Sequence, residues 1–387
     1  MKGFKEKTKN LDFSIFIVTL VLVCFGLVMV FSASYYYAKQ QFDDSEYFFT
    51  KQVIGALVGL AGLILFTFFD YRRLKKFYIA GIVISAVLLS VVLVPGVGRT
   101  LNGSSRWLVV AGFSVQPSEI AKFALVLFVA AFISKKPQRI KSFFRGVLPV
   151  LLVAGLFCGL ILKQPNFSMV LTIAGLAFVM LIIGGMRVRH GMLLGSAGVA
   201  GAVALTVIEP YRLRRLLVFI DPWADPSDAG YQLIQSLYAI GSGGLFGNGL
   251  GHSRQKYLFL PYRESDFIFA IIVEELGFVG AVVVVGLFFF LIYRGIRVAL
   301  SCPDMFGSLL AAGMSSLLAI QVLINICVVT GSIPPTGISL PFFSAGSSSL
   351  VICMSAMGVL LNISRSCTPV GRVKRRTPKR NTPKRAA

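Results

Sequence analysis

Residues 13–34 read FSIFIVTLVLVCFGLVMVFSAS, a run that contains no charged side chain. A helix of about 20 apolar residues crosses the roughly 30 Å hydrocarbon core of a bilayer, so this run predicts a transmembrane helix. The run follows four lysines in residues 1–12, as the apolar part of a signal peptide would, but it is too long for one and lacks a convincing cleavage site. We therefore expect residues 1–12 to form a cytoplasmic tail that leads into the first span.

Runs of the same kind recur along the whole chain. Of its 387 residues 56% are hydrophobic and only 14% are charged, and the mean hydropathy is +0.80. Average soluble domains carry about 25% charged residues, so this composition excludes a water-soluble fold. We expect an all-α polytopic membrane protein, with one domain over residues 13–363 and ten transmembrane helices. The predicted spans cover residues 13–34, 53–69, 79–94, 117–133, 146–162, 167–185, 191–208, 267–293, 305–330 and 345–363.

Lysine and arginine are distributed unequally between the two sides of these spans. The side that holds both tails carries 26 of the 38 basic residues, the other side carries 11, and Lys122 lies within a span. The positive-inside rule then predicts cytoplasmic N- and C-termini. The longest connection, residues 209–266, becomes a large extracellular loop between spans seven and eight, and loops of this length are usually functional. An amphipathic helix is expected within this loop, because four residues recur there with helical spacing: Tyr231, Ile234, Leu237 and Tyr238.

The formal net charge of +22 would suggest nucleic acid in a soluble protein, but here the location of the charge indicates no nucleic-acid partner. Residues 364–387 form a basic tail with no apolar residues able to build a core, which we expect to be disordered and attracted to anionic lipids. The six cysteines lie mostly inside apolar runs and make no C-x-x-C or Cys/His spacing. This pattern predicts neither a metal centre nor a disulfide framework.

Ionisable and aromatic residues at the predicted outer boundary are candidates for a binding site. Glu119 and Lys122 are three residues apart at the start of the fourth span, so they share a helix face. A structural ion pair and a contact with a charged headgroup are both consistent with this position. Arg106 can grip a phosphate through its planar guanidinium, and Trp107 suits either an interfacial anchor or a surface for a sugar ring.

Asp266 lies at the outer boundary of the eighth span, where water meets hydrocarbon. Partial desolvation there would raise the proton affinity of its carboxylate towards that of a general base, although its position alone favours an N-terminal helix cap. Arg254 and Lys256 are close in sequence, and two cations beside a base suit an anionic lipid substrate. Glu274 and Glu275 lie deeper in the span and cannot pair with Asp266, so we expect each to make its own structural hydrogen bonds.

A glycine-rich run, residues 241–251, reads GSGGLFGNGLG and invites comparison with a phosphate-binding loop. Neither a following G-K-[ST] nor a preceding strand is present, and the run lies on the predicted outer face. The phosphate-loop interpretation is therefore rejected.

Several longer segments are specific enough to identify a family. They are Arg106-Trp107, Gln116-Pro-Ser-Glu-Ile-Ala-Lys122, Asp221-Pro-Trp-Ala-Asp-Pro226, Gly230-Tyr-Gln-Leu-Ile-Gln-Ser236, Ser253-Arg-Gln-Lys256, Asp266-Phe-Ile-Phe-Ala270, Glu274-Glu-Leu-Gly277, Pro335-Thr-Gly337 and Leu340-Pro-Phe-Phe-Ser344. With these segments, residues 12–365 resemble the shape, elongation, division and sporulation (SEDS) family of membrane peptidoglycan glycosyltransferases. The resemblance is greater to the division and sporulation branch (FtsW and SpoVE) than to the elongation branch (RodA).

The resemblance implies an enzyme of the bacterial cell membrane that polymerises lipid II into β-1,4 glycan strands on the outer face, with inversion. It further implies a class B penicillin-binding protein as transpeptidase partner, together with other divisome proteins. It makes Asp266 the essential carboxylate and general base. A divalent cation, Mg²⁺ or Mn²⁺, is left open as an aid, and no metal ligands are assigned. The implied substrate-binding residues are Arg106, Trp107, Glu119, Lys122, Arg254 and Lys256.

The sequence departs from the family pattern just before this aspartate. Glu264-Ser265 stands where a His-Asn or His-Thr pair is usual, and Glu264 brings a second negative charge close to Asp266. Like-charge repulsion is expected to raise the proton affinity of one of the two.

Two other functions fit the same composition, namely a lipid II flippase and a non-catalytic scaffold of the wall-synthesis complex. The polar residues gather on one face rather than at the membrane midplane, which counts against a transporter.

Overall fold

A computed structural model describes residues 11–101, 104–110, 113–228 and 230–367. In these residues nine helices are long and apolar enough to cross a membrane, and α8 (Phe167–Ile183) is a shorter apolar helix. Each predicted span coincides with one of these helices, so the predicted all-α polytopic membrane class is confirmed. Residues 1–10 and 368–387 lie outside the described residues, and the predictions for the two tails stay predictions.

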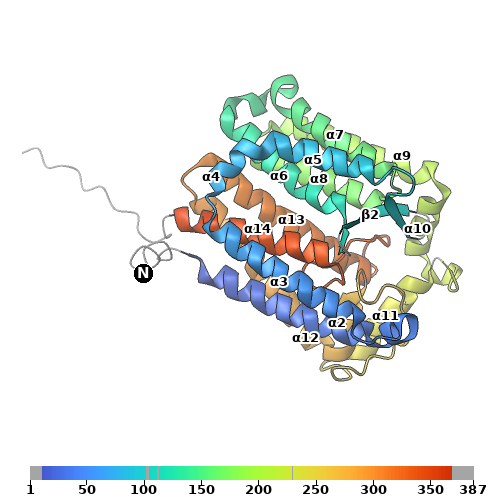
Figure 1. Ribbon diagram of the computed structural model, residues 1–387. Coiled ribbons are helices and arrows are strands. Elements are labelled where there is room, and N and C mark those ends of the chain that lie inside the picture. The colour runs from blue at the N-terminus through green and yellow to red at the C-terminus, as the bar shows by residue number, and fades with distance from the viewer. Residues whose placement is uncertain (1–10, 102–103, 111–112, 229, 368–387) are drawn as a thin grey trace, which may run out of the picture.

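The membrane helices alternate in direction along the chain (Figure 1). Two of them begin with a short segment of different geometry, since η1 (Lys75–Phe77) joins α4 to α5 and the π-helical η3 (Phe143–Val147) runs into α7. The other bounds are α2 (Phe13–Phe42), α3 (Tyr47–Phe68), α4 (Tyr71–Leu74), α5 (Tyr78–Val91), α6 (Pro117–Lys135), α7 (Leu148–Leu162), α9 (Val188–Ile208), α12 (Ile268–Ser301), α13 (Met305–Val329) and α14 (Ser347–Ser366).

The first membrane helix begins and the last one ends on the same face of the bundle, which we call the terminal face. The backbone N–H of Asp12 donates to Ser364 Oγ at 3.2 Å. The Asp12 carboxylate also accepts from Arg294 Nε at 2.9 Å, which ties α12 to the start of α2. We call the opposite face, which carries the connection from α9 to α12, the site face.

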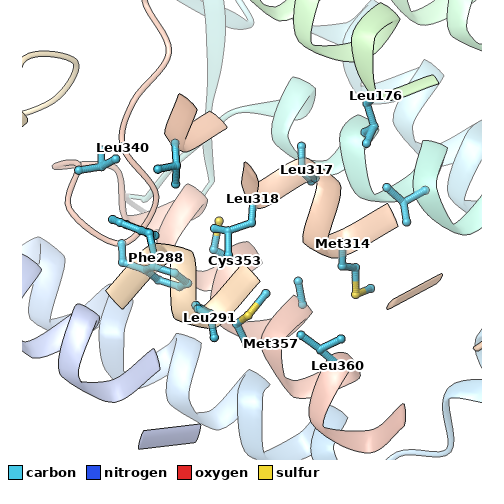
Figure 2. Packing of buried hydrophobic residues seen from close by; sticks show 14 of the residues in the cluster. Leu176, Phe288, Leu291, Met314, Leu317, Leu318, Leu340, Cys353, Met357 and Leu360 are labelled. Carbon is cyan, nitrogen blue, oxygen red and sulfur yellow. The ribbon is translucent and has the colours of Figure 1, made fainter. Parts of the chain in front are cut away.

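The core lies around α13, where α12, α14, α6 and α8 meet (Figure 1). Phe288, Leu291, Met314, Leu317 and Met357 are among its buried side chains (Figure 2). Because lipid tails are as apolar as these side chains, they stabilise the bundle through van der Waals packing rather than through removal from water.

α3 and α14 approach closely because α3 has glycines along one face. A Cβ on Gly55 would lie 2.9 Å from Ser347 Cβ, and a Cβ on Gly59 would lie 2.6 Å from Met354 Sδ. Small residues spaced four apart are a general means of close helix packing in membranes.

The site face contains secondary structure that the sequence analysis missed. Between α5 and α6, where the sequence analysis predicted no secondary structure, the chain forms an antiparallel sheet of β1 (Gly98–Leu101), β2 (Ser104–Val110) and β3 (Phe113–Val115). These strands are short, so their period-2 pattern is weak beside the turn residues.

The connection from residue 209 to residue 266 contains, in its described residues, three helical segments. The predicted amphipathic helix is confirmed as α11 (Tyr231–Gly243), and α10 (Pro210–Ile220) and η4 (Pro222–Ala224) precede it. On the terminal face η2 (Pro137–Lys141) lies between α6 and η3.

Candidate functional site

Asp266 lies at the end of α12 on the site face, just before the first helical residue. The N-cap of α12 is Phe267, and no side chain caps this helix end. The helix-cap interpretation of Asp266 is therefore wrong. Among the residues that the structure describes, none donates a hydrogen bond to its carboxylate, so these oxygens remain available to a ligand.

Neighbouring segments hold the main chain of Asp266 in place. Its carbonyl accepts a hydrogen bond from Asn325 Nδ2 of α13 at 2.7 Å. The same Nδ2 donates to the carbonyl of Ile338 at 2.8 Å, which brings the segment before α14 over the carboxylate. A Cβ built on Gly337 would lie 3.3 Å from Asp266 Oδ2, so a side chain at residue 337 would crowd the carboxylate.

The electrostatic environment of Asp266 suits a general base. Burial first and the charge of Glu264 second raise the pKa of its carboxyl, Arg106 and Arg215 act in the opposite direction, and the result is a pKa of about 6. Burial also raises the pKa of Glu264 above its ordinary value. The repulsion that we expected between the two acids is thus present. A base with a pKa near the working pH transfers protons most effectively.

Arg106 reaches this site from the sheet that the sequence did not predict. It lies on β2, where its Nε donates to the carbonyl of Gln164 at 3.3 Å and Nη2 donates to the carbonyl of Pro165. Trp107 is the next residue of the strand, so its half-buried side chain points to the other face of the sheet. The structure therefore places Arg106 near Asp266 and directs Trp107 away from it.

Arg215 is a second cation at the site, and the sequence analysis did not select it. It lies on α10, and its Nη1 donates to the carbonyl of Pro335 at 3.2 Å. Arg215 therefore contacts the same segment before α14 whose Gly337 lies next to the Asp266 carboxylate. The signal in the sequence was the amphipathic pattern of residues 210–220, in which Val218 is buried.

Glu119 and Lys122 form a buried ion pair at the site-face end of α6. Lys122 Nζ lies 2.7 Å from Glu119 Oε1, and the two side chains are 0% and 1% exposed. Ser349 Oγ of α14 donates to the other carboxylate oxygen at 3.2 Å. This arrangement matches the structural alternative, because the ammonium is fully enclosed and already paired.

Lys256 does not point at Asp266. Its side chain is 7% exposed and its Nζ lies 3.4 Å from Glu275 Oε1. The same carboxylate accepts from Ser32 Oγ at 2.7 and 2.8 Å, so Glu275 joins α2, α12 and the loop that follows α11. Closeness in sequence had suggested a pair of substrate-binding cations, but the structure gives Lys256 a structural partner.

Arg254 differs from Lys256, because its side chain is exposed and forms no ion pair within the described part of the chain. Its backbone N–H donates to Glu274 Oε1 at 2.8 Å, and Ser253 Oγ donates to Oε2 of the same carboxylate. Glu274 and Glu275 therefore have the structural hydrogen-bond roles that we expected, and Arg254 remains a candidate for binding an anion.

The glycine-rich run supports a break in α12 near the site. Gly277 has φ 69° and ψ −168° inside the helix, which interrupts the regular hydrogen bonds. The run replaces them, since the N–H of Asn248 donates to the carbonyl of Glu274 at 3.0 Å and the N–H of Phe278 donates to the carbonyl of Gly244 at 2.9 Å. The glycines thus serve backbone packing, which agrees with the rejection of a phosphate loop.

The described side chains around Asp266 do not form a cluster of metal ligands. Within the described ranges, no three or more His, Cys, Asp or Glu side chains come close enough together to hold a metal ion. Glu264 and Asp266 alone do not make such a site, and the proposals below use this chain's own residues.

Comparison with known proteins gives a consistent result. The family model described as "Cell cycle protein", for FtsW, RodA and SpoVE, matches residues 12–368. Stage V sporulation protein E of Bacillus subtilis (strain 168) is 46% identical over 359 residues, which cover 93% of this chain and 98% of the relative. A probable peptidoglycan glycosyltransferase FtsW of Geobacter sp. (strain M18) is 41% identical over 359 residues, with 93% and 98% covered.

Solved structures share the fold. One chain, from a study of how a peptidoglycan synthase complex coordinates polymerization and crosslinking, aligns with a TM-score of 0.76 at 30% identity and covers 92% of this chain and 98% of its own length. The rod shape determining protein RodA of Thermus thermophilus aligns with a TM-score of 0.67 at 28% identity, with 92% and 97% covered.

Proposed function

The chain belongs to the cell cycle protein family of FtsW, RodA and SpoVE, and from this membership we propose that it is a peptidoglycan glycosyltransferase that polymerises lipid II during cell division or sporulation. The observation that carries the proposal is Asp266, a carboxylate with a pKa of about 6 on which Arg106 and Arg215 act. A single base beside two cations suits a displacement that releases a diphosphate.

The proposed reaction is an inverting substitution. The 4-hydroxyl oxygen of the acceptor's GlcNAc attacks the anomeric carbon of the donor, and the bond from that carbon to the undecaprenyl diphosphate breaks. The diphosphate leaves with the electron pair of the broken bond, and the hydroxyl proton passes to the Asp266 carboxylate. Displacement on an α-linked donor gives a β-1,4 bond, and general-base help of this kind typically contributes about 10²- to 10⁴-fold.

Two arginines are proposed to stabilise the leaving diphosphate. Arg106 and Arg215 already act on the charge of Asp266, so a diphosphate beside this carboxylate would lie within their field. Arg254 is proposed to contact the diphosphate or peptide of a second substrate molecule, because its charge is exposed. Trp107, Glu119, Lys122 and Lys256 are proposed to shape the site rather than to touch the reacting atoms.

The site face is proposed to be extracellular and the terminal face cytoplasmic. This orientation follows the excess of lysine and arginine on the terminal side. The substrate's sugar and diphosphate would then meet Asp266 at the outer boundary of the membrane. A class B penicillin-binding protein is proposed as the transpeptidase partner, by analogy with the peptidoglycan synthase complex to which the fold is similar.

The test is polymerisation of labelled lipid II by the purified chain, with and without its cognate class B penicillin-binding protein. We expect wild type to make muramidase-sensitive glycan and Asp266→Asn to lose at least about 100-fold of the rate. Asp228→Asn is the matched control, because Asp228 is a site-face carboxylate with a side chain that is 71% exposed. Translocation of lipid II by proteoliposomes, without any polymer even with the partner present, would instead identify a flippase.

A further inference from the structure

A second site candidate lies on the terminal face, between the connection from α6 to α7 and the turn before α9. It is a cavity of about 480 Å³, and its lining includes Lys141, Arg187, Arg189, His190, Gln138 and Phe143. No residue of the catalytic proposal contributes to it.

The cavity carries positive charge without a compensating acid. Within the described part of the chain, Lys141, Arg187 and Arg189 form no ion pair, and no Asp or Glu lines the cavity. Arg187 is also the N-cap of the 21-residue helix α9, and no side chain caps this helix end. The free N–H groups and the helix dipole therefore add to the attraction for an anion. Three clustered cations repel one another, and an anion between them would relieve this repulsion.

A buried polar atom points to the same conclusion. His190 Nδ1 is buried and has no hydrogen-bond partner among the described residues. The His190 ring lies edge-on to Phe143, with the ring centroids 5.5 Å apart. In the tautomer that carries its hydrogen on Nδ1, this nitrogen would donate a hydrogen bond to an oxygen atom of a ligand.

The backbone beneath the cavity is closely packed. A Cβ on Gly146 would lie 2.1 Å from the carbonyl oxygen of Arg139, so η2 and η3 are in direct main-chain contact. Phe143 begins the π-helical η3, and π-helical turns frequently occur at functional sites. The lining side chains of η2 and η3, which are Gln138, Lys141 and Phe143, therefore extend from closely packed backbone.

The exposed apolar residues beside the cavity indicate that the anion belongs to a lipid. Phe144 is 75% exposed, Val188 is 76% exposed and Met192 is 66% exposed, and all three are apolar residues beside the cavity lining. Side chains of this kind at a membrane helix end meet acyl chains. Residues 1–10 and 368–387 cannot supply the anion, because both tails are strongly basic.

We propose that this cavity binds the phosphate group of an anionic lipid from the leaflet at the terminal face. Arg187 and Arg189 would hold the phosphate oxygens through their planar guanidinium groups, with Lys141 as a third cation. The acyl chains would extend along Phe144 and Val188. This site is independent of the glycosyltransferase proposal and would persist if that proposal failed.

The test compares two double variants that each remove two positive charges from the terminal face. Arg187→Gln/Arg189→Gln removes charges from the cavity, while Arg73→Gln/Lys76→Gln removes exposed charges from the connection between α3 and α5. The full-length chain is purified in neutral detergent, and its retained lipid is measured by native mass spectrometry with dioleoyl phosphatidylglycerol or dioleoyl phosphatidylcholine. Thermal unfolding of each protein reports whether it is folded.

We expect wild type to retain phosphatidylglycerol in preference to phosphatidylcholine. The cavity variant should bind phosphatidylglycerol about tenfold or more weakly, and the control variant should stay within about twofold of wild type. Equal losses in the two variants, or no preference for phosphatidylglycerol in wild type, would overturn the proposal.

Inorganic phosphate distinguishes the two possible sources of the ligand. A lipid site should keep its phosphatidylglycerol in millimolar phosphate, whereas displacement at that concentration would overturn the lipid assignment in favour of a soluble phosphate compound. If the double variant does not fold, Lys141→Gln carries the comparison, with Lys76→Gln as its control. A loss of about threefold or more in Lys141→Gln alone is then expected, and an unchanged affinity would contradict the proposal.

Discussion

The side-chain amide of Asn325 donates a hydrogen bond to the main-chain carbonyl of Asp266 at 2.7 Å. Asn325 is 0% exposed, and the same nitrogen also donates to the carbonyl of Ile338. One buried amide in the core helix α13 therefore fixes both the residue that bears the proposed base and the segment that lies over it.

Replacing Asn325 should consequently reduce activity more than it reduces folding. Asn325→Leu keeps a similar volume but removes both donors, and leaving buried carbonyls unpaired costs about 1–3 kcal/mol of stability. Because Asp266 would lose its position, we expect the polymerisation rate per folded molecule to fall by about tenfold or more.

Asn362→Leu is the matched control for this change. Asn362 is also buried and also makes two hydrogen bonds, to Tyr71 and Thr67 on the terminal face. It should lose similar stability while its polymerisation rate per folded molecule stays close to that of wild type. Equal activity losses in the two variants would show that Asn325 acts only through global stability.

The pH dependence of the rate should follow the carboxyl of Asp266. A general base works only when it is unprotonated, so kcat/KM should decline as the pH falls through about 6, the raised pKa of this group. Glu264 contributes to that rise, and Glu264→Gln should therefore lower the pKa and move the acidic limb of the profile to lower pH. A pH-rate profile that is unchanged in Glu264→Gln would contradict this account.

Arg215→Gln should move the same limb in the opposite direction. Arg215 lowers the pKa of Asp266, so its removal should raise that pKa and shift the acidic limb to higher pH. Loss of a cation from the diphosphate should also reduce kcat/KM by about 10- to 100-fold.

The neighbouring Arg214 provides the control for Arg215. Arg214 is 52% exposed and pairs with Asp225 and Asp228, so Arg214→Gln should change stability by no more than about 1 kcal/mol. The acidic limb of its pH-rate profile should coincide with that of wild type. A shift of the same size in both variants would assign the effect to net charge rather than to position.

Much of the fold follows from the sequence, but the site follows from it only in part. The spans were predictable because each hydrophobic run is local and long, as in residues 13–34. Arg106 was named as a binding candidate, but its place beside Asp266 was not predictable because it lies on an unexpected strand. Arg215 lies on a separate helix and was not selected at all. Lys256 shows the converse error, since it is near Asp266 in sequence but its ammonium pairs with Glu275. Tertiary contacts of this kind leave no periodic signal in the chain.

The ion pair between Lys256 and Glu275 should contribute to folding rather than to substrate binding. Lys256→Met would leave a buried carboxylate without its cation, and breaking a buried pair costs about 3–5 kcal/mol. We expect a large decrease in Tm, with part of it recovered in the double variant Lys256→Met/Glu275→Gln. A raised KM for lipid II with an unchanged Tm would instead make Lys256 a substrate contact.

The break in α12 depends on the backbone conformation of Gly277. Its φ of 69° disfavours any residue with a Cβ, and a Cβ there would lie 2.3 Å from the backbone nitrogen of Gly247. Gly277→Ala should therefore destabilise the protein by about 2–5 kcal/mol, through backbone strain and overlap together.

Gly286 is the control on the same helix, because a Cβ there would meet nothing within 4 Å. Gly286→Ala should be neutral or stabilising by up to about 1 kcal/mol, since alanine favours a helix over glycine. Equal changes in Tm for the two substitutions would contradict this account. They would mean that the contact between the glycine-rich run and α12 does not need a glycine at residue 277.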